Sequence, residues 1–66
     1  MTKYLVQYRT SETHNAIFFN TRQQAVEWVM IYLNDLCAPY TAPLTMLIEY
    51  AREMKIAYVT IEEHTI

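Results

Sequence analysis

The chain has 66 residues, of which 53% are hydrophobic and 14% aromatic, and its formal net charge at pH 7 is −2. This length allows one domain, residues 1–66, with a single core, and the charge balance favours neither phosphate-backbone binding nor DNA imitation. Glycine is absent, which excludes P-loop and dinucleotide-binding loops because only glycine lets the backbone approach a phosphate closely.

The first third of the chain predicts a β-hairpin. Residues 3–9 alternate in the manner of a strand, and residues 15–19 form a second apolar segment. The polar residues 10–14 between them read as a loop. Because this loop lacks glycine, a tight two-residue turn is not expected.

A helix is predicted over residues 22–35. Thr21 fits its N-cap, with Gln24 in the position from which a capping-box side chain reaches back. The helix is apolar nearly all round, so two neighbours should cover it. Only Glu27 and Asn34, with Ile31 between them, mark a side expected to face water.

Two prolines interrupt the middle of the chain. Pro39 lies in the break after the first helix, and Pro43 suits the first turn of a second helix that runs to residue 54. A third strand is predicted over residues 56–61. The polar tail, residues 62–66, is expected to fray.

The predicted fold is an α+β domain of order β-β-α-α-β. It has a three-stranded, mainly antiparallel sheet with a helical hairpin packed on one face. If the helices run back and forth across the sheet, the third strand lies antiparallel to the second or parallel to the first, and the pattern does not choose between these. The face under the helices should carry Tyr4, Val6, Tyr8, Ile17, Phe19, Ala57, Val59 and Ile61. The other face should carry Leu5, Gln7, Phe18, Ile56, Tyr58 and Thr60.

The two histidines raise the possibility of a metal site. In the predicted topology His14 and His64 lie at the same end of the sheet, with Glu12, Glu62 and Glu63 nearby. Neither histidine belongs to a ligand-spacing motif, and Cys37 is the only cysteine. The sequence therefore predicts no metal and no cofactor.

Catalytic residues are not expected either. Nothing places a histidine near Cys37, and the end of a helix disfavours its thiolate. Its apolar flanks instead predict a buried, reduced cysteine. Glu49 and Glu53 share a helix face with Arg52 and should be solvated. The chain is therefore predicted not to be an enzyme.

Aromatic residues leave a nucleic-acid interpretation open as the alternative. Phe18 and Tyr58, with Tyr4 or Tyr8, could stack the bases of single-stranded RNA on an open sheet face. The five lysines and arginines are dispersed along the chain, so no electrostatic groove supports this stacking. Nucleic-acid binding is accordingly the less favoured interpretation.

The surplus of apolar surface favours a protein-interaction module. The predicted contact residues are Leu5, Phe18, Tyr40, Met46, Tyr50 and Tyr58, because aromatic residues and methionine are enriched at desolvated interfaces. The partner is expected to be a second copy, as in a homodimer, or a larger protein for which the chain acts as an inhibitor or adaptor. Short chains of this kind are often accessory proteins of phages or mobile elements.

The same sequence predicts a cytoplasmic protein without a membrane partner. The N-terminus lacks the basic region and long apolar run of a signal peptide. The longest apolar run, residues 28–33, is far below the ~20 residues that span a bilayer.

Overall fold

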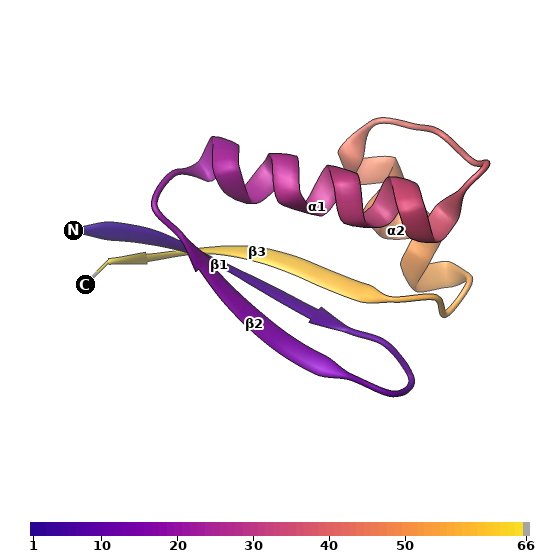
Figure 1. Cartoon of the computed structure of the whole chain (residues 1–66), viewed down its shortest axis with the longest axis horizontal. Helices are drawn as coiled ribbons and strands as arrows, with labels where there is room; N and C mark the ends of the chain where they lie inside the picture. The colour runs from indigo at the N-terminus through magenta and orange to yellow at the C-terminus, as the bar shows by residue number, and fades with distance from the viewer. Residues whose placement is uncertain (66) are drawn as a thin grey trace.

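A computed structural model describes residues 1–65 as an α+β domain of order β-β-α-α-β, with both helices on one face of a sheet (Figure 1). The elements are β1 (Thr2–Arg9), β2 (His14–Phe19), α1 (Arg22–Cys37), α2 (Leu44–Glu53) and β3 (Tyr58–Thr65). The predicted fold class is confirmed.

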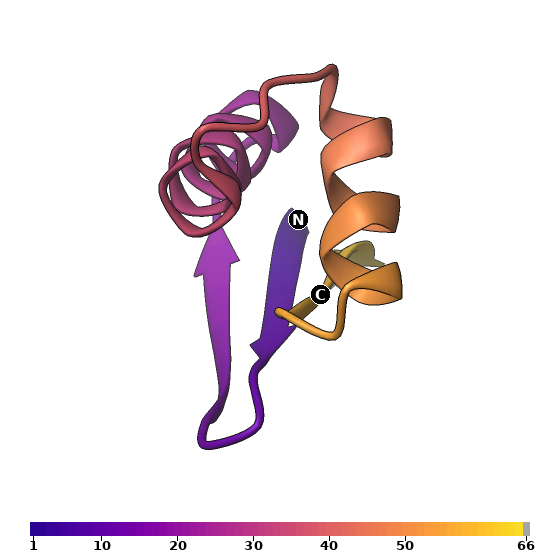
Figure 2. The ribbon, with the colours of Figure 1, turned by 90° about the vertical axis from the view of Figure 1, so that its right-hand side faces the viewer.

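The sheet order is β2-β1-β3, and β1 pairs antiparallel with both neighbours. Neither predicted placement of the third strand is correct, because β3 lies antiparallel to β1. The reason is the path of α2, whose ten residues span only about 15 Å. The two helices cross steeply instead of running back and forth (Figure 2). The chain therefore stays at the end of the sheet where α1 finishes, and Tyr58 enters β3 opposite Arg9.

The turn between β1 and β2 is built by two threonines. The Thr10 amide donates to the Thr13 carbonyl at 2.8 Å, and the Thr10 hydroxyl accepts from the amides of Glu12 and Thr13. This four-residue loop replaces the glycine turn that the sequence lacks, since a threonine hydroxyl can satisfy turn amides locally. The predicted loop is confirmed over residues 10–13, whereas His14 belongs to β2.

The N-terminus of α1 is capped as predicted. The Gln24 amide donates to the Thr21 hydroxyl at 3.2 Å. The Gln24 side chain accepts from the Asn20 amide at 3.3 Å, one residue before the expected position. The helix continues to Cys37, two residues beyond its predicted end.

One continuous core lies between the helices and the sheet. Its buried members are Val6, Ala25, Val29, Leu33, Cys37, Leu47, Ala51, Ala57 and Val59. Most of the predicted core face is therefore confirmed, with Tyr4, Tyr8, Phe19 and Ile61 packed against this cluster.

Two predictions about the C-terminal third are wrong. Ile56 does not lie on the open sheet face, because it precedes β3 and packs against the core. The tail does not fray over residues 62–65, because these residues pair with β1 and end in Thr65 opposite Thr2. Ile66 lies outside the described residues.

The C-terminus of α2 carries the one positive φ among the described residues, at Lys55. The Ile56 amide donates to the Ala51 carbonyl at 2.8 Å, and the Lys55 amide donates to the Arg52 carbonyl at 3.1 Å. These two bonds define a Schellman motif, in which glycine usually occupies the left-handed position. Lys55 has φ 57° there, and its Cβ makes this conformation costly.

Replacing Lys55 by glycine should therefore stabilise the domain. We expect Lys55→Gly to raise the free energy of unfolding by about 1 kcal/mol and the melting temperature by about 4–8 °C. Thermal unfolding followed by circular dichroism measures both. Lys55→Ala is the matched control, since it removes the charge but keeps the Cβ. Equal stabilisation by alanine would show that φ is not the cause.

Candidate protein-interaction surface

The sheet face away from the helices, the open face, is mixed in character. It carries Lys3, Leu5, Gln7 and Arg9 of β1, His14, Ala16 and Phe18 of β2, and Tyr58, Thr60, Glu62 and His64 of β3. Phe18 is 58% exposed, whereas Leu5 between the outer strands is only 8% exposed. The Phe18 and His64 rings meet edge to face across β1, with centroids 6.0 Å apart. Because Leu5 is buried, it is not accessible as a contact residue.

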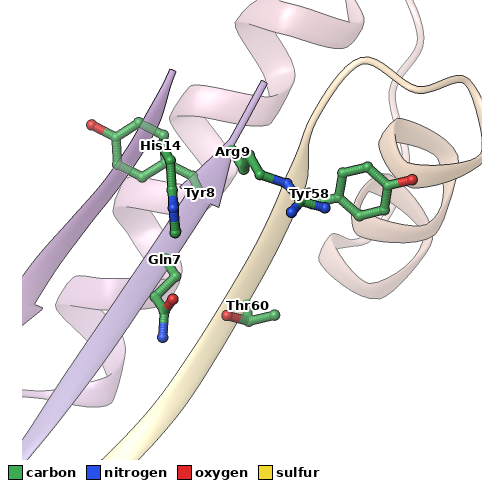
Figure 3. Close-up of a pocket in the computed structure, with 6 residues that line it drawn as sticks. All are labelled: Gln7, Tyr8, Arg9, His14, Tyr58 and Thr60. Atoms are coloured by element: carbon green, nitrogen blue, oxygen red, sulfur yellow. The ribbon is translucent and has the colours of Figure 1, made fainter. Parts of the chain in front are cut away.

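The opposite end of the open face holds a shallow pocket of about 300 Å³ (Figure 3). Arg9 reaches from β1 over the Tyr58 ring, with Cζ 4.8 Å from the ring centroid. Gln7, His14 and Thr60 line the same pocket. Tyr58 is thus already stacked on a cation from its own chain.

The predicted meeting of the two histidines is wrong. His14 pairs with Arg9 at one end of the sheet, and His64 pairs with Lys3 at the other. His64 instead lies 3.2 Å from the Glu62 carboxylate. Within residues 1–65, no group of three or more histidine, cysteine or acidic side chains is placed to hold a metal ion.

The remaining predicted contact residues lie away from the sheet. Tyr40 and Tyr50 are half-buried and stack on each other, with ring centroids 4.2 Å apart and planes 15° apart. Met46 of α2 is exposed. The predicted set is therefore divided between the open face (Leu5, Phe18, Tyr58) and the α2 side, and it does not form one continuous surface.

Burial explains the two altered pKa values. It raises the pKa of the Cys37 thiol, which stays protonated at neutral pH and is a poor nucleophile. Burial, and secondarily the adjacent Tyr8, raises the pKa of the Tyr32 hydroxyl. Neither residue gains chemical reactivity from this environment.

A more continuous apolar surface lies between the outer side of α1 and β2. We call it the α1–β2 flank and define it by Phe19, Trp28, Ile31 and Tyr32. Trp28 stacks on Tyr32 at 5.1 Å between ring centroids and lies 6.2 Å from Phe19. Ile31, at the outside of the helix, is 73% exposed.

Two adjoining hollows follow this flank. One, of about 490 Å³, is lined by Phe18, Phe19 and Asn20 at the end of β2 and by four residues of α1, Gln24, Glu27, Trp28 and Ile31. The next, of about 370 Å³, shares Trp28 and Ile31 and extends to Asp35. Together they form a shallow groove along the outer side of α1, with Trp28 and Ile31 at its centre and polar residues at its rim.

The groove runs beside an open sheet edge. In the described chain, β2 pairs only with β1. In an antiparallel ladder, hydrogen-bonded residue pairs alternate with pairs that are not hydrogen-bonded. The Thr10–Thr13 hydrogen bond sets this alternation, so Asn15, Ile17 and Phe19 direct their backbone groups toward β1. The backbone N–H and C=O groups of His14, Ala16 and Phe18 therefore point outward and are open to a further strand.

Sequence reasoning missed the α1–β2 flank. It assigned Trp28 and Tyr32 to the buried side of the helix, but both side chains are only half-buried. The signal was Ile31, a large apolar side chain on the side expected to face water. An isoleucine between Glu27 and Asn34 has no role in the core of this domain.

Comparisons with known proteins do not add to this geometry. No protein-family model matches the chain, and neither do curated proteins or solved structures. In residues 1–65, neither helix has the length and hydropathy that crossing a membrane requires.

Proposed function

We propose that this protein works by binding other protein chains through the α1–β2 flank and the adjoining edge of β2. The observation that carries the proposal is the coincidence of an apolar groove and an open strand edge on one side of the molecule. A segment added to β2 would gain main-chain hydrogen bonds and would place side chains in the groove. This is the recognition mode called strand addition.

The composition of the flank supports protein recognition over catalysis. Tryptophan and tyrosine supply large, rigid contact area and dominate the binding energy of many interfaces. Ile31 adds an exposed anchor at the centre of the groove. We therefore favour a small, non-enzymatic interaction protein of the type carried by phages, which is either a homodimer or an inhibitor or adaptor of a larger protein. The buried free thiol of Cys37 supports a reducing, cytoplasmic location.

Single-stranded nucleic-acid binding is less well supported. Phe18 and Tyr58 lie on the open face but pair with different residues of β1, Leu5 and Arg9, four positions apart. Each ring already has a partner in its own chain, His64 or Arg9. A row of neighbouring bases would need adjacent free rings.

Affinity capture with variant baits tests the proposed surface. Ile31→Glu places a charge in the groove, and Met54→Glu makes the same kind of change at an exposed position off the flank. We expect a protein partner from the native cell to bind the wild type and Met54→Glu alike. Its binding to Ile31→Glu should fall at least about tenfold, or 1.4 kcal/mol. Partners captured equally by all three baits would contradict the proposed surface.

A further inference from the structure

We propose that the occupant of the α1–β2 flank is a second copy of this chain. The two β2 strands pair antiparallel around a two-fold axis at Ala16. This inference rests on the proposed function, since it names the partner of the same surface. It yields a continuous six-stranded sheet, three strands from each copy.

The two edges of the sheet differ in charge. Strand β2 has the sequence HNAIFF, without a lysine, arginine, aspartate or glutamate. The other edge strand, β3, carries Glu62 and Glu63. Charged side chains on an edge strand protect it from pairing, and an uncharged apolar edge is a template for pairing. A β3–β3 contact would bring acidic side chains together, whereas a β2–β2 contact does not.

The outward backbone groups of β2 are self-complementary. They belong to His14, Ala16 and Phe18, a set that is symmetric about Ala16. An antiparallel pairing centred there joins Ala16 to Ala16 and His14 to Phe18 in both directions. Every outward group of the strand then meets an outward group of the second copy. On the open face, the pairing sets the Phe18 ring beside the imidazole of His14 from the other copy.

The charges near the ends of the paired strands are also compatible with β2–β2 pairing. In this register the Asn20 end of each β2 strand lies near the loop of the other copy that carries Glu12. The Lys3 ammonium group donates to the Asn20 side chain. Each end of the interface thus brings a lysine toward a glutamate. Such exposed pairs contribute less to affinity than to register and orientation.

The helices complete the interface. Because the outer side of α1 borders the β2 edge, the two-fold axis places the α1 helices antiparallel across it, with Ile31 of each copy facing the other flank. Glu27 and Asp35 line the outer rim of the groove and oppose each other across the axis. Exposed like charges of this kind cost less than about 1 kcal/mol. One strand and one helix flank per copy make a small interface, for which a Kd of roughly 10–100 µM is reasonable.

Light scattering over a concentration series, with two proline variants, tests the pairing. Ala16→Pro removes an outward N–H of β2, and Glu63→Pro removes an outward N–H of β3. Both positions are exposed, and proline is tolerated where an edge amide faces solvent. We expect the wild type and Glu63→Pro to approach twice the monomer mass of 7.9 kDa, and Ala16→Pro to remain monomeric.

Disulfide trapping tests the register. In the proposed dimer the Ala16 Cα atoms lie about 5.5 Å apart, a separation that a disulfide spans. His14→Cys on the same face is the control, since its symmetry mate lies about 13 Å along the strand. The wild type, with only buried Cys37, is the blank. In a glutathione buffer, Ala16→Cys should form covalent dimer at least about tenfold more than His14→Cys.

Any one of three results would overturn the second copy as occupant. The first is a wild type that stays monomeric at ~1 mM, a concentration well above the expected Kd. The others are an Ala16→Pro variant that dimerises like the wild type and equal disulfide trapping of the two cysteine variants. The proposed function fails separately. If the wild type is monomeric but still captures another protein in an Ile31-dependent manner, the surface stands and only the occupant is wrong. If both measurements are negative, both proposals fall.

Discussion

The Leu33→Ala variant is expected to lose most of the free energy of unfolding of this domain at 25 °C. Leu33 has no exposed surface and lies at the centre of the core between α1, α2 and the sheet. Truncating a fully buried leucine costs about 2–5 kcal/mol, from lost transfer free energy and the remaining cavity. A core in a domain this small rarely supplies more than about 3–5 kcal/mol. Urea unfolding followed by Trp28 fluorescence measures the loss.

Leu36 is the matched control for this prediction. It belongs to the same helix and loses the same atoms on mutation, but it is 36% exposed. We expect Leu36→Ala to cost less than about 1 kcal/mol, since surface substitutions are mild. If the two variants lost equal stability, Leu33 would not occupy the tightly packed centre that the structure gives it.

The Ile17→Pro variant is expected to lose roughly 2–4 kcal/mol, whereas Ala16→Pro next to it should lose less than about 1 kcal/mol. The Ile17 amide points toward β1 and pairs with Val6, so proline leaves a ladder carbonyl without its donor. The Ala16 amide points outward, and proline removes no bond within the chain. Denaturant titrations at low protein concentration compare the two variants without a contribution from self-association.

This pair of substitutions also checks the direction of the β2 backbone. A large loss for Ala16→Pro together with a small loss for Ile17→Pro would mean that the ladder alternation is reversed. The outward amides would then belong to Asn15, Ile17 and Phe19, and the strand pairing centred on Ala16 would be wrong.

The local elements were predictable because each carries its own chemical signature. Thr21 and Gln24 mark the start of α1 through the hydrogen bonds of a cap, which act within one helical turn. Alternation of apolar residues likewise assigns the core face of β1 and β2. Both signals depend on neighbours in sequence, so a single chain is enough to read them.

The position of β3 was not predictable by the same means. It depends on the angle at which α2 crosses α1. This angle follows from the packing of Leu47 and Ala51 against residues of α1 and the sheet that lie far from α2 in sequence. The second half of β3 was also not predicted, because Glu62 and His64 are polar. Their pairing with β1 stabilises an extended conformation that their own β-propensity does not favour.

The candidate site was predicted only in outline. The surplus of apolar residues indicates a contact surface, but burial decides which residues form it. Leu5 is buried, and Tyr40 is stacked on Tyr50. The α1–β2 flank arises because Trp28 and Tyr32 of α1 pack beside Phe19 of β2, which no local pattern reveals. Ile31 was visible in the sequence, but its neighbours in space were not.

Amide hydrogen exchange along β2, measured by NMR in dilute and concentrated solutions, is the most direct test of strand pairing at this edge. In dilute solution, we predict slow exchange for Asn15, Ile17 and Phe19, which bond to β1, and fast exchange for His14, Ala16 and Phe18. At concentrations above the expected Kd, the outer three amides should slow at least about tenfold as they gain partners. Outer amides that remain fast at every concentration would contradict the pairing of β2 with a second copy.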